Sequence, residues 1–160
     1  MKVTKLIHQV ATITSIDLGL LKRAVIKGLI FDLENTIVSA DDRYVSPGAE
    51  EWIQKAKGEG FRFFLCCNGK QIDRVKFWSE RLGIPAIVKA RKPLPFSFMK
   101  ALSQMHLHPH EVVVIGDSFH TDVLGAWLVG CQSIQVASLP HPRQWWEKLF
   151  GRLVHIPFHA

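Results

Sequence analysis

The segment VIKGLIFDLENT, residues 25–36, changes abruptly from apolar to polar at Asp32. A short, nearly continuous apolar run is typical of a β-strand that is buried on both faces of a parallel sheet. We therefore predict a strand over residues 25–31. Because ligands of open α/β sheets bind beyond the carboxyl ends of the strands, Asp32 and the residues after it are predicted to lie at a binding edge.

Short apolar runs continue to alternate with helical patterns along the chain. Further strands are predicted at 61–66, 86–88, 111–115 and 133–136. Helices are predicted from an N-cap at Ser46 with Pro47 as the first helical residue, from about Gln71 to a C-cap at Gly83, from an opening at Pro93 and Pro95, and from a cap at Thr121 to Gly130. This order predicts right-handed βαβ units, and hence a Rossmann-like three-layer α/β/α sandwich with a five-stranded parallel sheet.

Helical spacing also predicts which side chains of two of these helices are buried. One buried face is expected to consist of Ile72, Val75, Trp78 and Leu82, and the other of Phe98, Met99, Leu102 and Met105.

The domain organisation is predicted to be simple, with one domain over residues 1–160. The sequence contains no repeat, low-complexity segment or Gly-, Ser- or Pro-rich linker. Residues 1–24 form an N-terminal extension before the first predicted strand, and residues 141–160 form an amphipathic C-terminal helix and tail. Residues 33–45 are too few for a large cap domain, so the binding edge is expected to be open.

The composition indicates a globular protein, with 48% hydrophobic and 21% charged residues. No apolar run approaches the roughly 20 residues that span a bilayer, and no secretory signal is visible. The three cysteines form no CxxC pair, which argues against a zinc ribbon and fits reduced thiols in the cytoplasm. The net charge of +6 favours anionic partners such as phosphates or anionic lipids, and the dispersed basic residues argue against a nucleic-acid-binding arm.

Polar residues follow four of the predicted strands: Asp32 and Glu34, Cys67 and Asn68, Lys92, and Asp117 with Asp122. Two carboxylates from different strands, Asp32 and Asp117, can share a hard cation such as Mg²⁺. Lys92 adds a positive charge that keeps Asp32 ionised and attracts phosphate oxygens. The arrangement suits phosphoryl transfer, with Asp32 as the nucleophile.

Four segments, FDLENT (31–36), LCCNG (65–69), RKP (91–93) and IGDSFHTD (115–122), resemble the ordered motifs of the haloacid dehalogenase (HAD) superfamily of phosphatases. The likeness extends over roughly residues 10–137 and is greatest to the YqeG-type branch of subfamily IIIA, whose relatives include phosphatidylglycerophosphate phosphatases. It includes SIDLGLLKRAVIKGLIFDLENT, RVKFWSERLGIPAIVKARKP and VVVIGDSFHTDVLGA. The resemblance implies a Mg²⁺-dependent phosphomonoesterase that forms an aspartyl-phosphate.

The resemblance also implies a role for each motif residue. Asp32 is the nucleophile and a metal ligand, and Asp117 is a second metal ligand. Glu34 supplies a backbone carbonyl to the metal and a side chain as general acid and base. Cys67, with Asn68, holds the phosphoryl group, and Lys92 stabilises its charge. Asp122 orients Lys92 or the waters of the metal.

Two positions depart from the family pattern, which normally has aspartate at position 34 and serine or threonine at position 67. Glu34 is one methylene longer, and the thiol of Cys67 is a weak hydrogen-bond donor. The alternative hypothesis is therefore a catalytically weak or degenerate module that acts through a protein or RNA partner.

The remaining cysteines, the histidines and the C-terminal segment also allow predictions. Cys66 and Cys131 are predicted to be core residues, His106, His108 and His110 to lie in a solvated turn, and His120 to face the substrate mouth. The C-terminal apolar stripe of Trp145, Trp146, Leu149, Phe150 and Leu153 has two interpretations. It either closes the sheet as a terminal helix, the interpretation favoured from the pattern, or lies on an anionic membrane surface.

Overall fold

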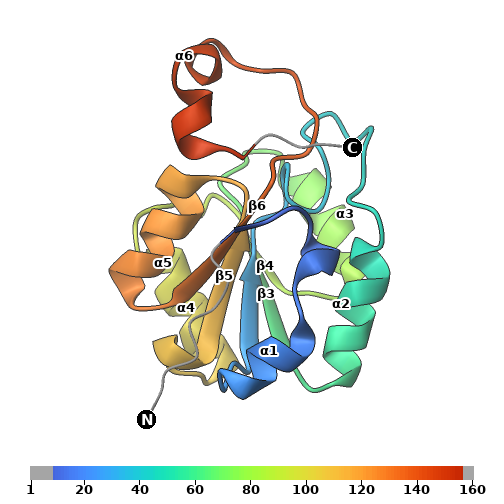
Figure 1. Cartoon of the computed structure of the whole chain (residues 1–160), viewed down its shortest axis with the longest axis vertical. Coiled ribbons are helices and arrows are strands. Elements are labelled where there is room, and N and C mark those ends of the chain that lie inside the picture. The colour runs from blue at the N-terminus through green and yellow to red at the C-terminus, as the bar shows by residue number, and fades with distance from the viewer. Residues whose placement is uncertain (1–8, 157–160) are drawn as a thin grey trace.

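A computed structural model describes residues 9–156, whose six strands form one parallel sheet in the order β1-β6-β5-β2-β3-β4 (Figure 1). The strands are β1 (Gln9–Val10), β2 (Gly28–Phe31), β3 (Arg62–Cys66), β4 (Ala86–Ile87), β5 (Val112–Gly116) and β6 (Gln132–Val136). The α-helices are α1 (Leu18–Arg23), α2 (Ala49–Gly58), α3 (Ile72–Leu82), α4 (Phe96–Met105), α5 (Leu124–Val129) and α6 (Trp145–Val154). The α/β class is confirmed.

The sheet has six strands rather than the predicted five because the N-terminal extension contributes β1. Gln9 pairs with Gln135 and Val10 with Val136 at the edge of β6. The rest of the described extension is also integral to the fold, since Trp52 of α2 donates a hydrogen bond to the carbonyl of Ile16 at 3.1 Å. Residues 1–8 of the extension and 157–160 of the tail lie outside the described residues.

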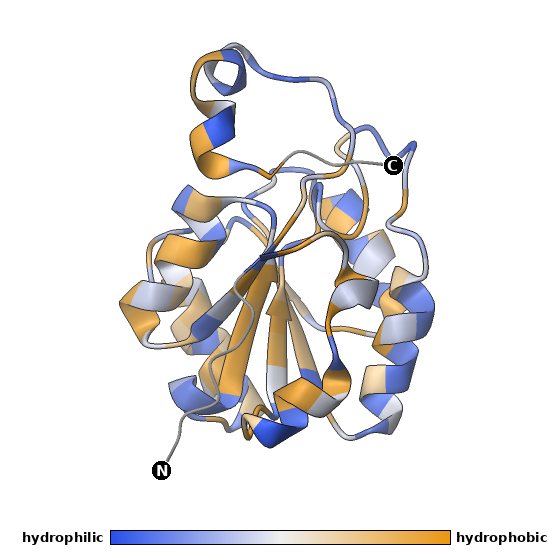
Figure 2. Ribbon diagram, in the orientation of Figure 1, coloured by the Kyte–Doolittle hydropathy of each residue, from blue (hydrophilic) through white to orange (hydrophobic). Residues whose placement is uncertain are grey.

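Two apolar layers separate the sheet from its helices. Leu29 and Phe31 of β2 belong to a cluster with side chains of α1, α2 and α3, whereas Ile30 packs with side chains of α4 and α5. Alternate residues of a strand point to opposite faces, so this continuous apolar strand serves both layers. The predicted three-layer arrangement is thus confirmed, and Figure 2 shows the apolar strands lying between the helices.

The register brings the ends of the central strands together. Phe31 is paired with Leu65 of β3 and with Ile115 of β5. The residues that follow these three positions therefore emerge at one edge of the sheet, where the sequence predicts the binding site.

Several predicted boundaries are wrong for local reasons. The first strand starts at Gly28, because Val25 has a positive φ of 61°. Gly48, with φ of 73°, precedes α2 instead of a Ser46 cap, and only the backbone carbonyl of Ser46 bonds to this turn. Thr121 lies inside a π-helical turn, Phe119–Val123, so α5 starts at Leu124.

Two side chains that were predicted to be buried are exposed. Met99 is 57% exposed, because the buried stripe of α4 runs through Phe98, Ala101, Leu102 and Met105. Ile72 is 47% exposed in the first turn of α3.

The C-terminal helix does not close the sheet, so the favoured interpretation of this segment is wrong. Helix α6 has no buried side chain and lies beyond the carboxyl ends of the strands (Figure 1). Among residues 9–156, no helix is both long and apolar enough to cross a membrane.

Candidate active site

A cavity of about 400 Å³ opens at the carboxyl edge of the sheet. Its lining includes every site residue predicted from the sequence except Asp122, which lies buried behind Lys92. The lining residues from the four motifs are Asp32, Glu34, Cys67, Asn68, Lys92 and Asp117.

Lys92 joins two carboxylates beneath this cavity. Its Nζ lies 3.1 Å from Oδ1 of Asp32 and 2.7 Å from Oδ1 of Asp122, and its side chain is almost fully buried. Burial alone would lower the pKa of Lys92, but the carboxylates of Asp122 and Asp32 outweigh it and hold this pKa above its ordinary value. Lys92 is therefore a permanent positive charge beside the predicted nucleophile.

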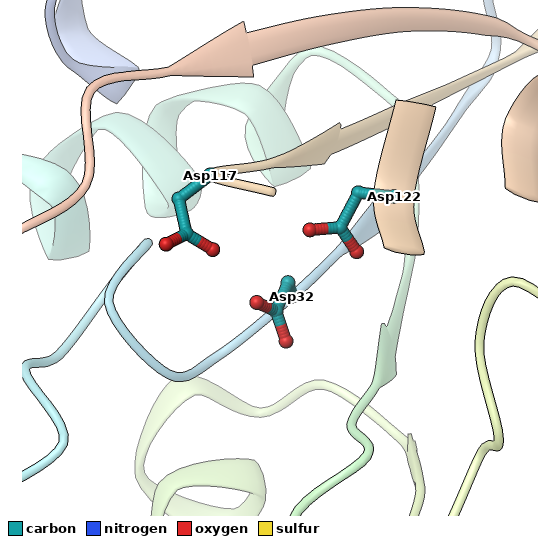
Figure 3. A group of neighbouring side chains, drawn as sticks. All are labelled: Asp32, Asp117 and Asp122. Carbon is teal, nitrogen blue, oxygen red and sulfur yellow. The ribbon is translucent and has the colours of Figure 1, made fainter. Parts of the chain in front are cut away.

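Three carboxyl groups, those of Asp32, Asp117 and Asp122, lie close to one another (Figure 3). An oxygen of each lies within 4.8 Å of the others. Burial raises the pKa of Asp32 to about 7, which Lys92 opposes and Asp117 reinforces. Burial also raises the pKa of Asp117 and of Asp122 to about 6. The single ammonium group of Lys92 thus cannot balance the negative charge of three ionised carboxylates.

The donor set suits a hard divalent cation, for which carboxylate oxygens are the preferred ligands. Asp122 is already engaged, because its Oδ1 binds Lys92 and its Oδ2 accepts a hydrogen bond from the backbone N–H of Ser118 at 3.3 Å. Asp32 and Asp117, the two carboxylates of the cluster that line the cavity, could hold the cation, and their assignment as metal ligands stays a prediction.

A close approach behind this cluster requires glycine. A Cβ atom at Gly116 would lie 2.2 Å from Oδ2 of Asp122. The π-helical turn after β5 directs Asp122 back over the strand end, so only glycine leaves room for the carboxylate that holds Lys92.

Asp117 has partners that the sequence analysis missed. The hydroxyl of Ser138 donates to its Oδ2 at 2.7 Å, and Nε2 of Gln135 donates to its backbone carbonyl at 3.0 Å. The sequence carried little signal for Gln135, because Gln132 and Ser133 of the same strand are also polar, and only the structure shows that Gln135 is buried, at 4% exposure. These contacts orient the carboxylate toward Asp32.

Asn68 lines the cavity, but its side chain binds the backbone of Lys92. Its Oδ1 accepts from the Lys92 N–H at 2.7 Å, and its Nδ2 donates to the Lys92 carbonyl at 3.1 Å. The amide therefore fixes the loop that carries the lysine, a positioning role that the sequence analysis did not foresee.

The two adjacent cysteines face opposite layers, as predicted. Cys66 packs with α4 and α5, while Cys67 lies in the other core cluster and borders the cavity. Burial raises the pKa of each thiol to about 12, so both stay protonated. Cys131 is buried as well.

Glu34 stands apart from the three buried acids, with its side chain 45% exposed at the rim of the cavity. Its Oε2 lies 3.8 Å from Nη1 of Arg74, which also donates from Nε to both oxygens of Asp42. Arg74 lines the cavity and was missed by the sequence analysis. It sits on a helix whose other charged residues are solvated, so its sequence pattern carried no signal.

The C-terminal segment forms part of the cavity wall. Trp146, Glu147 and His155 line it, and a short antiparallel bridge joins Ser118 to His155. Nε2 of His155 lies 3.6 Å from Oδ2 of Asp117. No separate cap domain exists within residues 9–156, and this segment takes a position above the strand ends instead.

Two histidine predictions concern the surface. His120 lines the cavity as expected and packs edge-to-face on Trp146 with ring centres 5.5 Å apart. His106, His108 and His110 are exposed around a turn, with the rings of the last two stacked 5.7 Å apart.

Known phosphatases are similar in sequence to this chain. A family model described as HAD-hydrolase-like matches residues 89–149. The chain is 42% identical to "Probable phosphatase YqeG" of Bacillus subtilis (strain 168), over 72% of this chain and 67% of that protein. It is 28% identical to glyceraldehyde 3-phosphate phosphatase of Pyrococcus furiosus, over 55% of this chain and only 40% of that protein.

Solved structures share the fold at low sequence identity. An uncharacterised protein from Listeria monocytogenes superposes with a TM-score of 0.60 at 17% identity, covering 84% of this chain and 87% of its own. The cobalt-bound deoxy-D-mannose-octulosonate 8-phosphate phosphatase of Haemophilus influenzae gives a TM-score of 0.56 at 14% identity, covering 84% and 78%. These structures show the shared fold, and the 42% identity to the Bacillus subtilis protein shows that the chain belongs to the YqeG-type phosphatases of the haloacid dehalogenase-like hydrolase family.

Proposed function

We propose that the chain is a Mg²⁺-dependent phosphomonoesterase that forms an aspartyl-phosphate on Asp32. The observation that carries the proposal is the contact of the buried Lys92 with Asp32, beside Asp117 and at the floor of an open cavity. A nucleophilic carboxylate needs positive charge around it to accept a phosphate dianion, and the lysine with a divalent cation supplies that charge.

In this proposal Asp32 and Glu34 carry out the covalent steps. An oxygen of Asp32 attacks the phosphorus, the bond to the ester oxygen breaks, and the leaving alkoxide takes a proton from Glu34. Glu34 then removes a proton from a water molecule that attacks the aspartyl-phosphate, which releases inorganic phosphate and restores Asp32. For this role the Glu34 carboxyl group must leave the neighbourhood of Arg74 and turn into the cavity.

The remaining residues bind and orient. Lys92 and Cys67 hold phosphoryl oxygens, Asn68 contacts the phosphoryl group or fixes the Lys92 loop, and Asp122 holds Lys92 in place. Asp32, Asp117 and the backbone carbonyl of Glu34 would hold Mg²⁺, and the cation would neutralise phosphate charge there.

The substrate is proposed to carry its phosphate on a large or surface-bound molecule, with phosphatidylglycerophosphate as the leading case. Within residues 9–156 no separate cap domain covers the cavity, which favours access of such a molecule, and the net charge of +6 favours an anionic lipid. The proposed location is the cytoplasm, at the membrane surface.

The test is phosphate release from p-nitrophenyl phosphate and from phosphatidylglycerophosphate, with and without Mg²⁺, in parallel with Asp32→Asn. We expect Mg²⁺-dependent release that falls on the order of 10⁴-fold in the variant, because the nucleophile is lost. Activity that persists in Asp32→Asn would rule out the aspartyl-phosphate, and the ratio of the two rates tests the lipid substrate.

The alternative of a weak or degenerate module is favoured by one observation. Glu34 points to Arg74 at the rim, and the thiol of Cys67 is a poor donor to a phosphate. Binding of Mg²⁺ without release of phosphate from either substrate would support this alternative.

A further inference from the structure

Exposed large apolar side chains gather on three helices. They are Phe96 and Met99 on α4, Phe119, Leu124, Trp127 and Leu128 on α5 and the turn before it, and Trp145, Leu149, Phe150 and Leu153 on α6. Trp127, Trp145 and Leu153 are 73%, 75% and 76% exposed. We call these residues the apolar face. Contiguous exposed apolar surface is rare on monomeric soluble proteins and usually marks an interaction site.

The three helices lie next to one another. Helix α4 packs against α5, and α6 contacts the turn before α5. Figure 1 shows α4 and α5 on the same side of the sheet, with α6 above α5. In Figure 2, apolar residues lie on the outward sides of α5 and α6.

The exposed charges of this half of the chain are all basic. No aspartate or glutamate is exposed among residues 89–156, whereas seven are exposed among residues 9–88. Glu147, a half-buried acid of this region, is held by Nε2 of His141 at 2.9 Å. The exposed charged residues of 89–156 are Lys89, Arg91, Lys100, Arg143, Lys148 and Arg152.

Helix α6 combines both properties on its solvent side. Trp145, Leu149 and Leu153 follow one another at intervals of four residues and so form one stripe. Lys148 and Arg152 immediately precede Leu149 and Leu153, which places their charges along one edge of that stripe. Aromatic and leucine side chains bordered by lysine and arginine are typical of helices that lie in the interface of an anionic membrane.

We propose that the apolar face docks on a lipid bilayer that contains anionic lipids. The positive charges of Lys148 and Arg152 complement lipid phosphates. Long basic side chains can keep their charge in the headgroup region while the apolar residues enter the membrane interface. A protein partner or a second copy gives no reason for the complete absence of exposed acids from this half of the chain.

Docking in this way would bring the active-site mouth to the membrane. Trp145 points to solvent, while its neighbour Trp146 lines the cavity together with His155. Helix α6 therefore separates the catalytic cavity from the docking surface by the width of one helix. The inference that a membrane phosphate is the substrate rests on the proposed function, but the docking itself does not.

The test is co-sedimentation of the full chain with phosphatidylcholine vesicles, alone or with about 30 mol% phosphatidylglycerol, at low and high salt. We expect binding only to the anionic vesicles, weakened by salt. Leu149→Ser with Leu153→Ser should weaken it by at least about tenfold, because apolar area is lost from the interface. Lys148→Glu with Arg152→Glu should also abolish the preference for anionic lipid.

Matched controls lie on the opposite side of the molecule. Phe77 on α3 is 55% exposed, so Phe77→Ser removes an exposed apolar side chain outside the apolar face. Lys55→Glu with Lys76→Glu repeats the charge reversal on α2 and α3. These controls should bind vesicles as the unsubstituted chain does, and circular dichroism checks that all variants fold.

Three outcomes would overturn the docking proposal. They are no binding to anionic vesicles, equal loss in the controls, and a concentration-dependent dimer that the leucine variant dissociates without any vesicle binding. Asp32→Asn should bind vesicles unchanged. Vesicle binding without any phosphatase activity would defeat the proposed function alone, and activity on p-nitrophenyl phosphate without vesicle binding would defeat docking alone.

Discussion

The floor and the roof of the cavity are built in opposite ways. The floor consists of Asp32, Lys92 and Asp117, which come after strands β2, β4 and β5. These side chains are held by buried ion pairs and hydrogen bonds. The roof consists of Trp146 and His155, carried by a helix that has no buried side chain. This difference suggests that the floor performs the chemistry, which needs rigid geometry, and that the roof affects which molecule enters.

The largest effect is expected from removing the lysine of the floor. Lys92→Met leaves Asp32 and Asp122 buried without their cation, and we expect a loss of about 3–5 kcal/mol in the free energy of unfolding. Activity should be lost with it. Urea denaturation of the metal-free protein measures the change, and Trp146→Ala is the control from the roof. A Lys92→Met variant as stable as its parent would contradict the picture of a floor held by this pair.

The second effect is expected at Glu34 and Cys67, the two positions beside the floor that depart from the family pattern. Glu34→Asp with Cys67→Ser restores the residues that are usual in the family. If Glu34 is displaced by about 1 Å, the double variant should gain roughly tenfold to a hundredfold in kcat, since catalysis is steep in geometry.

Rates with p-nitrophenyl phosphate, together with each single substitution, assign the gain to one position. An unchanged kcat would mean that Glu34 and Cys67 already serve the reaction, and that the alternative of a degenerate site is wrong.

The third effect is a pH dependence of stability that arises from the acids of the floor, Asp32 and Asp117, and from Asp122 beside them. Folding raises the pKa of Asp32 to about 7 and those of Asp117 and Asp122 to about 6, above the ordinary aspartate value of 3.8. The folded chain therefore binds these protons more tightly than the unfolded chain. Without Mg²⁺, the free energy of unfolding should fall as pH rises from about 4 to about 7, by on the order of 1 kcal/mol or more.

Adding Mg²⁺ should remove most of this slope, because the cation compensates the ionised carboxylates. Thermal unfolding at several pH values, with and without Mg²⁺, isolates the carboxylates from the histidines of the roof. A slope that is the same in both conditions would show that Asp32 and Asp117 are not the cation site.

The smallest effect is expected from the roof. Trp146→Ala should raise KM about three- to tenfold with little change in kcat, because Trp146 lines the cavity without touching the buried acids. Steady-state kinetics with small and lipid substrates measure the split between the two constants. A large fall in kcat would place the roof in the chemistry and remove the distinction between the two walls.

The sequence was most informative where polarity changes at the end of an apolar strand. Asp32, Cys67 and Asp117 were placed at one edge because parallel strands of similar length bring their carboxyl ends together. The sequence was less informative where a side chain has a choice of partners. Asn68 was assigned to the substrate, yet it bonds to the backbone of Lys92, since its amide matches a neighbouring N–H and C=O.

By itself, the sequence determined the family, the sandwich and the acids and lysine of the site, because these depend on local hydrophobic runs and on residues adjacent to them. Only the tertiary structure decided the extra strand β1, the pairing of Glu34 with Arg74 and the position of α6 over the cavity. These depend on contacts between residues far apart in the chain. As a pattern, the apolar stripe of α6 favours a helix that faces a core, and only the structure shows that no side chain of this helix is buried.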